Sequence, residues 1–364
     1  MREAMTVDLI PAPTEEQAMV LDATVRFIQN EFPLTRVRER VDGRDGVGSG
    51  YRKGAAELGW FGMLADETHG GGSASDNGLV DAAMIAAERG AVLQPGPYVG
   101  HSVVVHALST AGGDPRLPDL LQGNSWATWI PGGAELRGSA LHGVVGAAAE
   151  IDDCAWLLVT ARSPEGPAQL LVPTDAPGLT VHPLDGLDLT RRWFRVEFDG
   201  VVPDTVIGGP GAETARAVAR QEQIAAVLSA AEAVGAMHAN FALALEYAKS
   251  RIAFGRPIGS FQAIKHLLAD TSLWLEMSKA IVANAAEALG QRDVTGGAAL
   301  AHAAKSFVGE RSAELTQNCF QIFGGIGYTW EHDQHLFLRR LAAERVAFGS
   351  PSWHRDQLLK LGNL

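Results

Sequence analysis

The spacing of apolar residues changes twice along the chain. Up to about residue 122, apolar side chains recur at helical intervals, and Thr14 with Gln17 three residues later predicts a capped helix start. From about 123 to 208 the helical period is lost, and β-rich runs such as WATWI and AWLLVTA are separated by Gly, Pro and Asp. Helical spacing then returns. The pattern predicts a mainly α fold in three parts: a helical domain over 1–122, a small β domain over 123–208 and a helical domain over 209–364.

The last third of the chain predicts a helix bundle. A nearly unbroken helical pattern runs from Glu213 to Lys249, a second ends near Leu289, and an Ala-rich third covers Gly297 to Asn318. Two shorter helices are expected after Glu331. Small residues on facing stripes of long helices are typical of a four-helix bundle.

A short turn separates the first two helices of this bundle. It lies within the stretch RIAFGRPIGSFQAIKHLLAD, which starts at Arg251. Glycine and proline in GRPIG break the helix, because proline lacks an amide donor and glycine tolerates unusual dihedrals. Ser260 is a plausible N-cap for the next helix. An apolar stripe then follows at helical spacing, formed by Phe261, Ile264, Leu268 and Leu275.

A second glycine-containing stretch follows about sixty residues later. It reads QIFGGIG from Gln321 to Gly327 and continues as YTWEHDQHLFLRR. Only a residue without Cβ lets backbone amides come close to a phosphate, and the paired glycines have this property.

Together, the two stretches resemble the C-terminal signatures of the acyl-CoA dehydrogenase family. The order of GWFGML, an acidic residue, GGG, a helix ending in ERG and then PGP resembles the N-terminal helical domain of the same family. The resemblance implies a helical domain, a β-barrel-like middle domain and a C-terminal four-helix bundle. It also implies FAD as cofactor, an acyl-CoA thioester as substrate of an α,β-dehydrogenation, and electron-transferring flavoprotein as electron acceptor.

The resemblance also implies flavin contacts, made to a flavin that a neighbouring subunit mainly holds. Arg251 would donate to the pyrophosphate, Phe254 and Ile258 would pack on the adenosine or ring edge, and Gln321 would approach the ribose and phosphates. The full set of expected cofactor-binding residues is Arg251, Phe254, Ile258, Phe261, Gln262, Gln321, Gly324 and Gly325. The alternatives are an Arg251 ion pair on the bundle surface and a helix-end turn at Gln321 and Gly325.

The catalytic base is missing from the places where the family carries it. The reaction needs a carboxylate to remove the α proton of the thioester. The two usual places hold Phe348 and Ala225, and neither side chain can accept a proton. Glu222 and Glu232 are nearby carboxylates that would serve only if the alignment were displaced by three or more residues. The base is therefore left unassigned.

The middle domain departs from the family as well. The segment WIPGGAELRGSALHGVVGAAAEIDD reads as much shortened, without the Gly-x-Lys-x-Trp-Ile-Thr strand that binds the flavin ring. Three hypotheses follow. The chain is the non-catalytic-type subunit of an actinobacterial mixed α2β2 enzyme, in steroid or fatty-acid catabolism; or it is a self-sufficient homomeric dehydrogenase with a displaced base; or it is a non-enzymatic helical scaffold derived from the family.

Composition narrows the picture further. The chain has 364 residues, of which 46% are hydrophobic, and a formal net charge of -12. The acidic balance argues against nucleic-acid binding, which needs a basic footprint. Two distant cysteines exclude a cysteine zinc site and a disulfide framework. Since no apolar leader or 18-residue apolar run is present, we expect a cytoplasmic protein that does not span a membrane.

Overall fold

The computed structural model describes residues 6–41, 47–291 and 296–362. The N-terminal part is helical, and the Thr14–Gln17 capping box forms as predicted, with Gln17 N donating to Thr14 Oγ1 over 3.2 Å. Its elements are α1 (Glu15–Glu31), α2 (Leu34–Arg40), α3 (Ser49–Glu57), the 3₁₀ turn η1 (Glu67–His69), α4 (Gly78–Ala91), α5 (Tyr98–Thr110) and α6 (Leu117–Leu121).

One seven-stranded sheet forms the middle of the chain, with strand order β5-β6-β2-β1-β3-β4-β7. β1 and β3 are parallel, and the other paired strands are antiparallel. The strands are β1 (Ala127–Arg137), β2 (Ala140–Ala149), β3 (Trp156–Arg162), β4 (Ala168–Pro173), β5 (Leu179–Leu184), β6 (Trp193–Val201) and β7 (Thr205–Gly208).

The segment before β3 contains a strand that the sequence analysis did not name. β2 is a full ten-residue strand that pairs with both β1 and β6. It escaped the sequence interpretation because LHGVVGAAA has few large β-forming residues and few turn signals at its ends. The strand is therefore present, and its last three residues are Ala147, Ala148 and Ala149.

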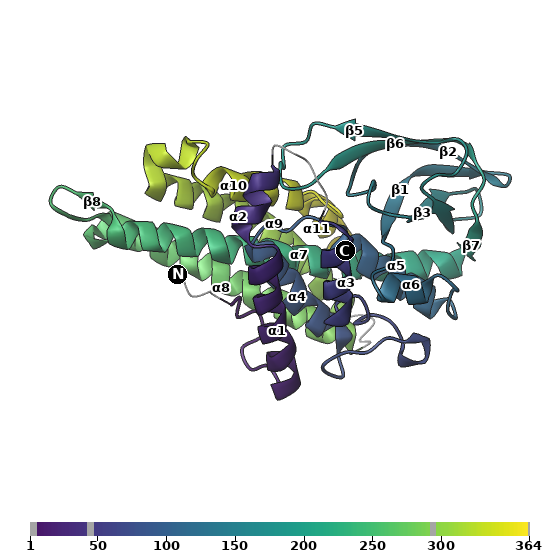
Figure 1. Ribbon diagram of the computed structural model, residues 1–364, viewed down its shortest axis with the longest axis horizontal. Coiled ribbons are helices and arrows are strands. Elements are labelled where there is room, and N and C mark those ends of the chain that lie inside the picture. Colours follow the sequence, from purple (N-terminus) through teal and green to yellow (C-terminus); the bar gives the residue numbers. More distant parts are fainter. Residues whose placement is uncertain (1–5, 42–46, 292–295, 363–364) are drawn as a thin grey trace.

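The C-terminal part is built on three long helices, with two shorter helices packed against them. The elements are α7 (Ala212–Ser250), the hairpin strands β8 (Ile252–Ala253) and β9 (Arg256–Pro257), the 3₁₀ turn η2 (Ile258–Ser260), α8 (Gln262–Gly290), α9 (Gly296–Phe323), the 3₁₀ turn η3 (Gly324–Tyr328), α10 (Gln334–Glu344) and α11 (Pro351–Leu361). Figure 1 shows the hairpin at one end of the molecule and the sheet at the other.

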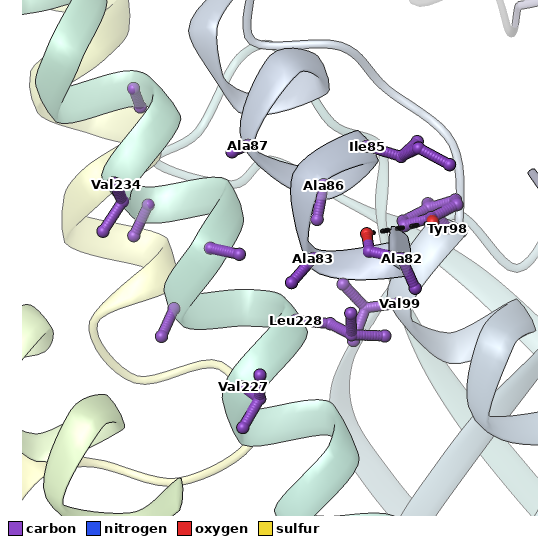
Figure 2. Packing of buried hydrophobic residues seen from close by; sticks show 14 of the residues in the cluster. Ala82, Ala83, Ile85, Ala86, Ala87, Tyr98, Val99, Val227, Leu228 and Val234 are labelled. Carbon is purple, nitrogen blue, oxygen red and sulfur yellow. Dashed lines mark hydrogen bonds between the residues drawn. The ribbon is translucent and has the colours of Figure 1, made fainter. Parts of the chain in front are cut away.

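The core is centred on α7, which packs tightly against α4. Figure 2 shows small and branched side chains from both helices meeting, with the Tyr98 hydroxyl donating to the Ala82 carbonyl over 3.1 Å. A Cβ at Gly235 would lie 1.8 Å from the Ala87 carbonyl oxygen, so glycine is required at this crossing. α7 is long and apolar enough to cross a membrane, but 89% of its most apolar window is buried inside the protein, as expected of a core helix.

The predicted N-cap of α8 is wrong. Ser260 belongs to η2, and its hydroxyl donates to the Pro257 carbonyl over 2.7 Å. The helix begins at Gln262 after Phe261, without a side-chain cap. The cause is the 3₁₀ turn, which uses the serine hydroxyl locally, as serine commonly does in turns.

Candidate functional site

The β8–β9 hairpin projects an aromatic residue into solvent. Ala253 pairs with Arg256, which leaves Phe254 and Gly255 as the loop, with φ of 50° and 76°. Such a loop requires positive φ at both positions, which glycine and asparagine tolerate and phenylalanine does not. Phe254 is nevertheless 96% exposed. Its ring meets that of Phe261 edge-on at 6.3 Å, so the hairpin presents an aromatic face.

Arg251 lies at the base of this hairpin. Its backbone N–H donates to the Tyr247 carbonyl over 2.8 Å, and its carbonyl accepts from Ile258 N over 2.8 Å. Its side chain is exposed, and within residues 6–41, 47–291 and 296–362 the guanidinium has no hydrogen bond or ion pair. The surface ion pair that was the alternative interpretation of Arg251 is not formed in this part of the chain.

The second glycine-containing stretch reaches the same end of the bundle. The Tyr247 ring, in the last turn of α7, contacts the Phe323 ring at 5.2 Å, and Phe323 ends α9. Gln321 is exposed on that last turn of α9. A Cβ at Gly324, where φ is 60°, or at Gly325 would meet nothing within 4 Å. Both glycines therefore border open space, where backbone can approach a ligand.

The remaining predicted flavin contacts lie beside the hairpin. Ile258 and Phe261 are half-buried, and Ile258 packs on the main core. Gln262 is exposed in the first turn of α8 and, like Gln321, has no side-chain hydrogen bond to the described residues. This end of the bundle thus offers the Arg251 guanidinium, a second guanidinium at Arg256 stacked on Phe261, two amides and an open glycine backbone. Such donors and open backbone fit a pyrophosphate and its sugars.

A second feature is a hollow of about 390 Å³ between β1, β2 and the N-terminus of α5. It is bordered by Phe348, the position where the resemblance implies the family's base. Phe348 lies in its wall, and its ring is parallel to that of Trp129, with centroids 6.3 Å apart and planes 7° apart. Ala147, Ala148 and Ala149 also line the hollow. The hollow is therefore mainly apolar.

One carboxylate that sequence reasoning missed reaches this hollow. Among the residues that line it, all of them in the described part of the chain, only Glu150 carries a carboxyl group. It is 1% exposed and accepts from Arg192 Nη2 over 3.2 Å. Burial raises the pKa of the Glu150 carboxyl, and the opposing effect of Arg192 is smaller. In the sequence, Glu150 stands out only as an acidic residue that follows three alanines.

A buried ionic cluster lies next to the hollow, and its central residue, Arg191, also lines the hollow. Arg191 joins two carboxylates, Glu232 Oε2 at 2.6 Å and Glu344 Oε1 at 2.5 Å, which are 2% and 1% exposed. Lys305 Nζ donates to Ser229 Oγ over 2.9 Å, and Ser229 donates to Glu344 Oε2 over 2.8 Å. Burial lowers the pKa of Lys305 to about 8. These cations and anions come from the middle domain and the bundle, so the cluster joins them.

The two carboxylates that were alternatives for the base do not reach the hollow. Glu232 is held in the ionic cluster, where Arg89 Nε also lies 3.9 Å away. Glu222 is half-buried elsewhere on α7, and burial raises the pKa of its carboxyl. Ala225 is fully buried on the same helix. In the described ranges, moreover, no group of three or more His, Cys, Asp or Glu side chains could hold a metal ion.

Fold and sites together define a protein of the acyl-CoA dehydrogenase type, and comparison with known proteins agrees. Residues 14–116 match the acyl-CoA dehydrogenase N-terminal domain, and residues 216–361 match the acyl-CoA dehydrogenase C-terminal domain. The chain therefore belongs to the acyl-CoA dehydrogenase family, whose members are flavin oxidoreductases that use FAD.

Two curated relatives come from Mycobacterium tuberculosis. The chain is 34% identical to acyl-CoA dehydrogenase FadE34 over 298 residues, which is 79% of this chain and 38% of that protein. It is 29% identical to acyl-CoA dehydrogenase IpdE2 over 343 residues, which is 93% of this chain and 95% of that protein. The chain thus spans well under half of FadE34 and nearly all of IpdE2.

Two solved structures share the fold. A Tcur3481-Tcur3483 steroid ACAD variant superposes with a TM-score of 0.85 at 22% identity, covering 96% of this chain and 98% of that one. The ChsE4-ChsE5 complex from Mycobacterium tuberculosis gives a TM-score of 0.82 at 19% identity, covering 96% and 97%. The expected fold class is confirmed.

Proposed function

We propose that this chain is one subunit of a heteromeric acyl-CoA dehydrogenase, in which it completes a flavin site whose ring an unlike subunit holds. One contrast carries the proposal. At the bundle end, the Arg251 and Gln321 side chains make no hydrogen bond or ion pair with the described residues and lie near open glycine backbone, whereas Phe348 stands where the resemblance implies the base.

The two halves lie too far apart in one chain to serve one flavin together. Ser229, in the ionic cluster, and Arg251, at the hairpin, are separated along α7 by about 30 Å at 1.5 Å per residue. Figure 1 likewise shows the sheet and the hairpin at opposite ends of the molecule. A flavin that uses the hairpin end of this chain therefore needs a ring pocket from another chain.

At this shared site, FAD would accept the hydride from the β carbon of an acyl-CoA thioester. Arg251 binds the pyrophosphate, since a guanidinium fork matches phosphate oxygens. Phe254 and Ile258 pack on the adenosine or ring edge, beside Phe261 and Gln262. Gln321 and the backbone at Gly324 and Gly325 approach the ribose and phosphates.

The relatives support a substrate class and partners for the proposed subunit. A steroid ACAD and a two-protein complex share the fold, which supports an unlike acyl-CoA dehydrogenase subunit in a heterotetramer acting on steroid-derived or fatty-acyl thioesters. The proposal places the assembly in the cytoplasm, with electron-transferring flavoprotein as its electron acceptor.

The test of the flavin contact is Arg251→Ala in the assembled protein. Losing one charge-assisted contact should weaken flavin binding by about 2 kcal/mol, or about 30-fold. Arg162→Ala is the matched control, because Arg162 is an exposed arginine on β3 that pairs with Glu135 at 2.9 Å. Equal flavin affinity in the two variants would contradict the assignment of Arg251.

The test of the subunit role compares the chain alone with the chain co-expressed with an unlike family member. Alone, it should not dehydrogenate a panel of acyl-CoA thioesters with an artificial electron acceptor, because neither Phe348 nor Ala225 can take the α proton. Flavin-dependent turnover by the pure chain would instead support the homomeric alternative. Glu150 would then be the base to test first, since its carboxylate reaches the hollow. A flavin-free assembly would favour the scaffold alternative.

A further inference from the structure

A long groove lies between the N-terminal helices and the bundle. It measures about 1010 Å³ and is lined by residues of α1, α2, α4, α7, α9 and α10. Its α7 residues recur every three or four positions from His238 to Ser250, so one face of the helix borders the groove over about 18 Å, at 1.5 Å per residue. Small-molecule pockets have volumes of about 300–1,000 Å³, so this groove has room for an elongated ligand.

The walls of the groove are mainly apolar and carry no cation. The apolar side chains come from both the N-terminal helices and the bundle and include Val25, Ile28, Leu34, Val92, Leu243 and Phe337. Among the described residues that line the groove, none is lysine or arginine, whereas Glu88 and Glu246 contribute carboxyl groups. A buried anion would find no partner in these walls, and an unpaired buried charge is costly. The lining therefore fits a ligand without negative charge.

One end of the groove holds a buried carboxyl group with an unused oxygen. Glu88, near the end of α4, is 5% exposed, and its Oε1 accepts from Val7 N over 2.6 Å. Its Oε2 has no hydrogen bond to a described residue. Burial raises the pKa of the Glu88 carboxyl to about 8, so at neutral pH it is protonated and can donate a hydrogen bond. Such a group suits a neutral hydroxyl or carbonyl oxygen.

His238 lies at the same end, since Asp8 acts on the pKa of both His238 and Glu88. Both ring nitrogens of His238 are buried and have no hydrogen-bond partner among the described residues. Burial lowers the pKa of His238, so its ring is neutral at pH 7. Buried polar groups are nearly always hydrogen-bonded, so two incompletely bonded groups at one end of an apolar groove indicate a missing polar partner.

We propose that this groove binds an elongated, uncharged apolar molecule with a terminal hydroxyl or carbonyl oxygen, and that Glu88 binds this oxygen. The apolar body of the ligand lies along α7 between Leu34 and Leu243. Glu88 is next to Ala87, which meets Gly235 at the α4–α7 crossing, whereas the proposed flavin contacts are at the hairpin. The inference is therefore independent of the proposed function.

The first test titrates decanol into the full chain, purified alone, by isothermal titration calorimetry at pH 7. The wild type should show saturable binding, and Glu88→Leu should bind at least about tenfold more weakly, because one hydrogen bond to the ligand is lost. Glu88→Gln should bind close to the wild type, since an amide can donate to the ligand and accept from Val7 N–H. Absence of saturable binding by the folded wild type would overturn the proposal.

A second variant leaves Glu88 and its Val7 hydrogen bond in place, so it decides the point if Glu88→Leu does not fold. Ala242 is half-buried and lines the groove, and Ala242→Trp should fill it and abolish decanol binding. Ala217→Trp is the matched control, because Ala217 is exposed on the same helix and does not line the groove. Equal decanol affinity of the two tryptophan variants, both folded by circular dichroism, would contradict the location.

The ligand class is tested with probes of the same chain length and different charge. Decanoate and decylammonium should each bind at least about tenfold more weakly than decanol, because the walls hold no cation and the carboxyl at the polar end is neutral. Decylammonium binding more tightly than decanol would show that Glu88 acts as an ion-pair partner and would overturn the uncharged class. Tighter binding of decanoate would overturn it as well.

Discussion

Replacing Arg191 with methionine tests whether the buried ionic cluster holds the middle domain on the bundle. The Arg191 side chain is 8% exposed and bridges Glu232 and Glu344, which are almost fully buried. Breaking a buried pair by removing one partner costs about 3–5 kcal/mol, because a charge is left without compensation. Glu232 would keep Arg89 at 3.9 Å, and Glu344 would keep its Ser229 hydrogen bond. We therefore expect the lower end, about 3 kcal/mol.

The assay is urea unfolding at neutral pH, followed by circular dichroism and by tryptophan fluorescence. Arg191→Lys should fall between the wild type and Arg191→Met, because an ammonium keeps the charge but loses the fork that spans two carboxylates. Arg162→Met, at an exposed arginine, should cost less than about 1 kcal/mol. The reasoning would be refuted if Arg191→Met matched the surface variant.

Two further changes test the packing and the buried histidine pair of His302 and His354. Gly235→Ala should lower the free energy of unfolding in urea by about 3 kcal/mol, because a Cβ at Gly235 meets the Ala87 carbonyl oxygen at 1.8 Å. Gly50→Ala is the control and should be neutral or stabilising, because a Cβ there meets nothing within 4 Å. Equal effects of the two variants would contradict the close α4–α7 crossing. Burial lowers the pKa of His302 to about 4 and that of His354 to about 3 from 6.5, so below pH 6.5 the unfolded chain takes up protons that the folded chain does not. The free energy of unfolding should fall from pH 6.5 toward pH 4 by about 1.4 kcal/mol per pH unit for each histidine. In His302→Gln this dependence on pH should be weaker by the contribution of one histidine. If the wild type and His302→Gln showed parallel pH profiles of unfolding, the reasoning would be contradicted.

The fold class was predictable because apolar spacing reports which faces are buried. Helical periods and a capping pair mark α1, and α7 runs within one residue at each end of its predicted range. The failures have local causes. Ser260 was assigned to a helix cap, but a 3₁₀ turn uses its hydroxyl, and β2 was missed because alanine and glycine carry no strand pattern. Both errors arise where side chains are small or can bond locally.

The candidate sites were predictable to different degrees. The end of the bundle proposed to contact flavin follows from two motifs, each contiguous in the sequence, and the Tyr247–Phe323 contact places both at one end. The ionic cluster could not be found this way, because its members are far apart in the chain. Ser229 donates to Glu344 across 115 residues, and Lys305 donates to Ser229 across 76. No spacing rule connects such positions, and only the packed domains bring them together.

The hairpin tip gives an independent argument that another chain covers this end of the bundle. Phe254 occupies the first position of a loop that requires positive φ, where a residue with a Cβ is strained. Burial of its ring would offset that strain, yet the ring is 96% exposed and contacts Phe261 only edge-on. In the isolated chain, Phe254 therefore costs free energy twice, through its backbone and through its exposed apolar surface. A ligand or a neighbouring chain that covers the ring would remove the cost of its exposed apolar surface. A glycine at this position has no side chain that could make such a contact. The strained, exposed phenylalanine thus supports the proposed assembly, as do the Arg251 and Gln321 side chains, which make no hydrogen bond or ion pair with the described residues.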